Sequence, residues 1–142
     1  MIKQVVFLKK RPDMSMQEFM DYYEKQHTQL SKLMGAKPAL PNAQRYVRRY
    51  LTPEKNPLTG EVIHPGYDCI MEIWWNSRAD FEAAMAGLRN PEFLQARLED
   101  ERKVFATNSN PVCIVEEYDS PVGPHNKIPR WAPEAASESE IL

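Results

Sequence analysis

Residues 2–34 read IKQVVFLKKRPDMSMQEFMDYYEKQHTQLSKLM, and this stretch predicts a strand, a turn and a helix. The β-branched and aromatic residues of 2–9 are typical of a strand, and the RPD sequence after them is typical of a turn. Ser15 followed by Glu18 is a capping-box pattern, so we expect a helix to begin there and to run over 15–34. A strand joined directly to a capped helix is how a split βαβ unit begins.

His27 falls on the apolar face of that expected helix. Steps of three or four residues bring six side chains to one face: Met16, Met20, Tyr23, His27, Leu30 and Met34. An imidazole there faces the interior, and its ordinary pKa of about 6.5 suits it to exchange protons near neutral pH. We therefore take His27 as a candidate general acid or base. The alternative is a hydrogen-bonded core histidine with no chemical role.

The later segments complete the order β-α-β-β-α-β. Strands are expected at 43–51, 67–75 and 112–118, where aromatic and β-branched residues are concentrated. A short helix capped by Ser77 and a second helical segment over 90–105 precede the last strand. This order predicts an α+β, ferredoxin-like βαββαβ fold, with a four-stranded antiparallel sheet and its helices on one face. Because no helix remains for the other face, we expect a homodimer that packs sheet against sheet.

Composition limits the classes of partner. With 142 residues and 42% hydrophobic content, the chain is expected to form one globular domain over 1–118. A net charge of -2 argues against a nucleic-acid partner, and no apolar run is long enough to predict a membrane helix or a signal peptide. We therefore expect a cytoplasmic protein that binds neither nucleic acid nor membrane.

Residues 119–142 are rich in proline and then acidic, which predicts an irregular tail. Trp131 within the tail favours docking of the IPRW sequence on the body of the same or the partner subunit. His64 and His125 lie in a proline-rich loop and in this tail. Exposed histidines in such segments are usually inert, and the alternative is that either segment closes over a pocket.

The cysteines, histidines and glycines form no cofactor-binding pattern. Cys69 and Cys113 lie in apolar strand-like runs, where free thiols behave as small hydrophobic residues. The three histidines lack the spacing of metal ligands, and the five glycines are too scattered to form a phosphate-binding loop. We expect neither a metal nor a cofactor.

Three stretches resemble EthD-like proteins of the dimeric α+β barrel superfamily. They are FLKKRPDMSMQEFMDYYEKQHTQL at 7–30, YDCIMEIWWNSRADFEAAM at 67–85 and NPEFLQARLEDERKVF at 90–105. The resemblance covers roughly residues 2–118 and implies a dimeric α+β barrel. Relatives have been associated with cofactor-independent polyketide cyclases, dehydratases and lactone isomerases, and others are accessory proteins. The family's histidine is usually followed by a small residue and proline, whereas Thr28, Gln29 and Leu30 follow His27.

A pocket between the helices and the sheet would be lined by His27 and Tyr23, with aromatic strand residues as its floor. Proton removal beside a carbonyl needs a base, for which we take His27, and a donor for the enolate oxygen, for which we take Tyr23 or Tyr46. Both tyrosines also fit a purely structural role in the core. Arg48 could anchor a substrate carboxylate, or it could form a structural ion pair.

Asp68, Glu72 and Trp74 share one face of the expected strand 67–75. The two acids are candidates for substrate binding as a carboxylate pair, with Trp74 as part of the floor. Alternatively, they pair with arginines of the preceding strand: Arg45, Arg48 or Arg49.

Together these features predict a cofactor-independent dehydratase, cyclase or isomerase, that is, a lyase or isomerase acting by proton transfer. Its expected substrate is a small hydrophobic or aromatic carbonyl compound, cyclic or polyketide-like. A non-catalytic small-molecule-binding or accessory protein is the alternative, and a cofactor-free monooxygenase is the second alternative, since the superfamily contains such enzymes.

Overall fold

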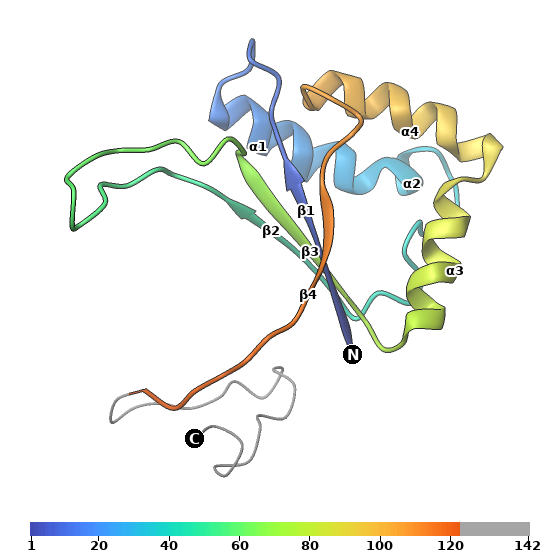
Figure 1. The fold of residues 1–142 in the computed structure, drawn as a ribbon. Helices are drawn as coiled ribbons and strands as arrows, with labels where there is room; N and C mark the ends of the chain where they lie inside the picture. The colour runs from blue at the N-terminus through green and yellow to red at the C-terminus, as the bar shows by residue number, and fades with distance from the viewer. Residues whose placement is uncertain (123–142) are drawn as a thin grey trace.

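The computed structural model describes residues 1–122, and its central layer is an antiparallel sheet (Figure 1). The strands are β1 (Ile2–Leu8), β2 (Arg45–Tyr50), β3 (Cys69–Trp75) and β4 (Val112–Val115), in the order β2-β3-β1-β4. Each strand is one to three residues shorter than expected. This strand order and direction are those of a ferredoxin-like fold, which confirms the predicted fold class.

The helices pack on one side of the sheet (Figure 1). They are α1 (Met16–Lys25), the 3-10 turn η1 (His27–Gln29), α2 (Leu30–Leu33), α3 (Arg78–Leu88) and α4 (Pro91–Val104). The predicted capping box is present, because the Glu18 amide donates to Ser15 Oγ at 3.1 Å and the Ser15 amide donates to Glu18 Oε1 at 3.1 Å. Ser77 and Asn90 cap α3 and α4 as expected. Among the described residues, every helix is too short or too polar to cross a bilayer.

The single helix expected over 15–34 is interrupted, so that prediction was wrong. α1 ends at Lys25, and the 3-10 turn that follows carries His27. The Thr28 hydroxyl donates to the Glu24 carbonyl at 2.7 Å, a local side-chain bond that competes with regular helix geometry. The apolar face therefore does not continue to Met34, which is 44% exposed.

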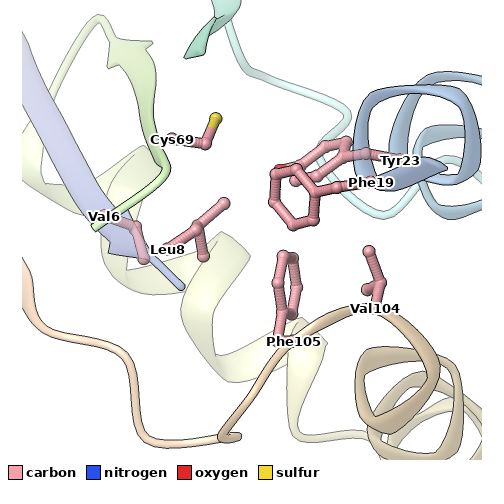
Figure 2. Packing of buried hydrophobic residues seen from close by; sticks show 7 residues of the cluster. All are labelled: Val6, Leu8, Phe19, Tyr23, Cys69, Val104 and Phe105. Carbon is pink, nitrogen blue, oxygen red and sulfur yellow. The ribbon is translucent and has the colours of Figure 1, made fainter. Parts of the chain in front are cut away.

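The main core lies between α1, α4 and the β1–β3 part of the sheet, and Figure 2 shows its side chains converging. Its buried members are Val6, Leu8, Phe19, Tyr23, Cys69, Val104 and Phe105. A second cluster around Ile73, Trp75 and Ala84 joins β3 to α3. These contacts hold α1 and α4 side by side over the sheet, which is the arrangement that forms the site described below.

The opposite face of the sheet carries no helix in the described part of the chain. The register places Val5 beside Glu72 and Glu72 beside Val47 on that face. The Trp74 ring lies there between two cations, with the Lys3 ammonium 4.0 Å and the Arg45 guanidinium 4.8 Å from the ring centre.

Cys69 is buried, as expected of a small hydrophobic residue, whereas Cys113 is exposed because it lies on the edge strand β4. His125, Trp131 and the expected docking of the tail fall within 123–142, outside the described residues.

Candidate active site

A cavity of about 260 Å³ lies between the helices and the sheet. Its sheet side is formed by side chains such as Val6, Met71 and Ile73, and its helix side includes His27 and Phe105. This volume is a little below the ~300 Å³ at which pockets for drug-sized ligands begin, so the cavity suits a small ligand.

His27 is held by a carboxylate from α4. Its Nδ1 lies 2.7 Å from Asp100 Oδ2, and the Tyr22 hydroxyl donates to Asp100 Oδ1 at 2.5 Å. Asp100 is only 7% exposed, and a buried carboxylate needs donors of this kind. Because an ionised carboxylate can only accept, this bond places a proton on His27 Nδ1, and in the neutral imidazole the lone pair is then on Nε2. Within residues 1–122 no hydrogen bond engages Nε2 of this cavity-lining side chain.

The imidazole ring is also fixed in orientation by its neighbours. It packs edge-to-face against Tyr23 at 5.3 Å and Phe105 at 5.4 Å between ring centres. Burial, together with the Asp100 carboxylate, raises the pKa of Tyr22 to about 12, so this hydroxyl stays a donor to Asp100 at neutral pH. The arrangement matches a general base whose second nitrogen is oriented by an acid.

Tyr23 and Tyr46 both line the cavity, and their hydroxyl oxygens lie 2.8 Å apart. Burial raises the pKa of both phenols above the ordinary value, so both stay protonated. In such a pair one hydroxyl donates to the other, and the second proton remains available to a third partner. The pair can therefore donate one hydrogen bond to a carbonyl oxygen in the cavity.

Arg48 does not line the cavity, because its guanidinium is paired within the protein. It donates to both oxygens of Glu24, with Nε 2.9 Å from Oε2, and the Tyr50 hydroxyl donates to the same Oε2 at 2.6 Å. The Arg48 hydrogen bond is the main reason why the pKa of Glu24 is lowered. This is the structural ion pair that the sequence left as the alternative.

Glu72, Trp74 and Asp68 also lie away from the cavity. Strand alternation explains this for β3, since Met71 and Ile73 face the cavity and the side chains between and beyond them point to the opposite face. Glu72 accepts from Trp74 Nε1 at 2.9 Å and lies 3.4 Å from Arg49, so its pairing with the neighbouring strand is the predicted alternative.

Asp68 precedes β3, and it accepts from the Lys10 amide at 2.9 Å and lies 3.4 Å from His64 Nε2. The exposed loop histidine therefore has a carboxylate partner of its own, outside the cavity. The proposed carboxylate pair of Asp68 and Glu72 is not formed, because each acid has separate partners.

Asp100 is the residue that the sequence argument missed. It stands in the charged run EDERK at 99–103, which looks like a solvated helix face. A signal was nevertheless present, because the steps from Phe93 to Arg97, Asp100 and Val104 are four, three and four residues. The same spacing of three or four residues that places His27 on the apolar face of the first helix places Asp100 on the inward face of α4.

Comparison with known proteins places the chain in a family. The EthD domain model matches residues 11–109. Among solved structures, an EthD family protein from Bacillus halodurans C-125 is 18% identical with a TM-score of 0.51, covering 82% of this chain and 99% of its own. An EthD-like protein from Ralstonia eutropha JMP134 is 17% identical with a TM-score of 0.53, covering 81% of this chain and 89% of its own.

A protein from Arabidopsis thaliana is 14% identical with a TM-score of 0.52, covering 86% of this chain and 100% of its own. At these identities the structures show a shared fold and no more. No curated protein matches the chain. Since the family model spans more than half of the sequence, the chain belongs to the EthD domain family.

Proposed function

We propose that this protein is a cofactor-independent enzyme that transfers a proton on a hydrophobic cyclic or polyketide-like carbonyl compound, as a dehydratase, cyclase or isomerase. The observation that carries the proposal is the His27–Asp100 pair, in which a cavity-lining imidazole has Nδ1 bound to a buried carboxylate. Membership of the EthD family supports a role on small molecules.

The reaction begins when His27 Nε2 takes a proton from the carbon next to the substrate carbonyl. The Asp100 carboxylate stabilises the imidazolium that forms, and the Tyr23–Tyr46 pair donates a hydrogen bond to the enolate oxygen. In a dehydration the imidazolium then gives its proton to a leaving hydroxyl on the β carbon, and water departs. In an isomerisation it returns the proton to a different carbon.

The size of the cavity narrows the substrate. A volume of about 260 Å³ favours one or two rings over an extended polycyclic skeleton. Apart from Gln4 and Tyr46 the sheet side of the cavity is apolar, which favours a ring system with few polar substituents on that side.

The test measures proton transfer directly, with 1-tetralone, a hydrophobic bicyclic ketone, as the probe. Exchange of its α protons in deuterium oxide is followed by NMR for the wild type, for His27→Gln and for His64→Gln. His64 is a matched control, because it also pairs with an aspartate but lies outside the cavity. We expect exchange above the background rate in the wild type and in His64→Gln, and background exchange in His27→Gln.

Equal exchange in the wild type and His27→Gln would contradict the proposed role. Binding of the ketone without exchange above background in any variant would instead favour the non-catalytic binding role.

We further propose that the protein is a homodimer that packs sheet against sheet. The helix-free face carries Val47, which is partly exposed, and Cys113, which is exposed on β4 opposite Val5, and a second copy would remove both from water. Light scattering is expected to give twice the chain mass for the wild type and a lower mass for Val47→Asp. A wild-type monomer at micromolar concentration would refute this assembly.

A further inference from the structure

The cavity has a polar wall that the proposed proton transfer does not use. It is formed by Arg97 and Glu101 of α4 and by Asn108 and Asn110 of the segment between α4 and β4. Among the described residues that line the cavity, Arg97 and Glu101 are the only Arg, Lys, Asp or Glu side chains. The wall therefore offers the cavity a guanidinium, a carboxylate and two amides.

The Arg97 guanidinium is held in place by one hydrogen bond and keeps donors for a ligand. Its Nε donates to Glu101 Oε1 at 3.3 Å, and Asn108 Nδ2 donates to Glu101 Oε2 at 3.1 Å, so the carboxylate is held on both oxygens. Neither terminal amino group of Arg97 has a hydrogen-bond partner within residues 1–122. The Arg97 side chain is 25% exposed, and two parallel N–H donors in that setting match a carboxylate.

The positive charge of Arg97 acts on Tyr46, one of the two hydrogen-bonded tyrosines of the cavity. It lowers the pKa of Tyr46, acting against the larger rise that burial causes. Arg97 therefore lies close enough to influence a ligand that contacts Tyr46.

Asn110 offers a buried acceptor with no partner. Its Nδ2 donates to the Thr107 carbonyl at 3.1 Å, which identifies the other amide atom as the oxygen. That Oδ1 is buried and receives no hydrogen bond from the residues the structure describes. Buried acceptors in native proteins nearly always have a donor, but an atom with almost no accessible surface leaves no room for a ligand hydroxyl. Arg97 is therefore the group of this wall that can bind a ligand.

We propose that Arg97 selects the substrate, and that the substrate is a carboxylic acid whose carboxylate binds the terminal amino groups of Arg97. This inference rests on the proposed function, because it names the substrate class of the same cavity. It adds that one ring substituent is anionic at neutral pH.

The test compares 2-naphthoate with its neutral methyl ester by isothermal titration calorimetry. The wild type is expected to bind the acid about tenfold more tightly than the ester, and Arg97→Gln is expected to lose this preference while keeping its affinity for the ester. Arg97→Lys keeps the positive charge but loses the two parallel N–H donors, and it should retain part of the preference for the acid over the ester. Arg78→Gln is the matched control, because Arg78 also pairs with a glutamate four residues on, at the exposed surface of α3.

Equal affinity of the wild type for acid and ester would overturn the proposal, and this measurement does not depend on the folding of any variant. A full acid preference in Arg97→Gln would overturn the role of Arg97.

Loss of ketone exchange in His27→Gln, together with equal affinity for acid and ester, would reject this inference and keep the proposed function. Unchanged ketone exchange in His27→Gln, together with tighter binding of the acid than of the ester, would reject the proposed function alone.

Discussion

Replacing Asp100 with asparagine tests whether the carboxylate serves proton transfer or only the packing of α4. The asparagine has nearly the same shape, but it cannot stabilise a positive charge on His27. Asp100 now accepts from His27 Nδ1 at 2.7 Å and from the Tyr22 hydroxyl at 2.5 Å. The amide oxygen can accept from His27 Nδ1 while the amide nitrogen donates to the Tyr22 oxygen, so one bond reverses, both contacts are kept and the charge is removed.

The expected effect on rate follows from the distance between the charges. The 2.7 Å contact places the centres of an imidazolium and a carboxylate about 4 Å apart, where an effective dielectric constant of 20 gives an attraction of about 4 kcal/mol. The side chains of His27 and Asp100 are 11% and 9% exposed, so solvent screens them little. At about 1.4 kcal/mol per factor of ten, the exchange rate should fall roughly 10³-fold.

The assay is α-proton exchange of 1-tetralone, with urea unfolding measured on the same samples. The free energy of unfolding should change by no more than about 2 kcal/mol, because loss of the charge also removes the cost of burying it. Tyr22→Phe is the control, since it removes one bond to Asp100 and keeps the charge. An exchange rate within tenfold of the wild type in Asp100→Asn would refute the reasoning.

Three further predictions concern stability and reactivity. Glu24→Gln should cost less than about 1 kcal/mol at pH 7, because the Glu24 side chain is 39% exposed and solvent screens its pair with Arg48. The pKa of Glu24 in the folded protein is lowered from 4.5, so the stabilisation by the ion pair is present above pH 4.5 and is lost as the pH falls through the folded pKa. If the wild type instead gained stability over Glu24→Gln in urea unfolding at pH 3, this prediction would be contradicted. Burial raises the pKa of Cys69 to about 12, so in Cys113→Ser iodoacetamide at pH 8 should leave Cys69 unmodified until urea unfolds the chain, and rapid labelling of the folded protein would argue against the described core. Phe19 has no exposed surface, and Phe19→Ala should lower the free energy of unfolding by about 3–5 kcal/mol; a loss below 1 kcal/mol would be inconsistent with its packing.

Features that depend on near neighbours were predictable from the sequence. The capping box at Ser15 and the caps at Ser77 and Asn90 are formed as expected, because each needs only residues two or three positions away. Strand alternation divided β3 correctly into two faces, with Met71 on one and Glu72 on the other. What alternation could not decide is which face the helices cover.

The helix break at His27 shows where the periodicity argument ended. The 3.6-residue pattern continued to Met34, but the hydroxyl of Thr28 bonds to the Glu24 carbonyl and the chain turns. Periodicity describes which side chains would share a face if the helix continued. It carries no information about a local bond that stops the helix.

The sequence by itself determined the order of elements, the ferredoxin-like class and the inward position of His27. Only the tertiary structure decided that Asp100, 73 residues away, binds His27 Nδ1, and that Arg97 rather than Arg48 reaches the cavity. The physical reason is that caps and periodicity act through neighbours along the chain. The partners of a buried imidazole or guanidinium depend on how separate helices pack on the sheet, and here that packing brings α4 against α1.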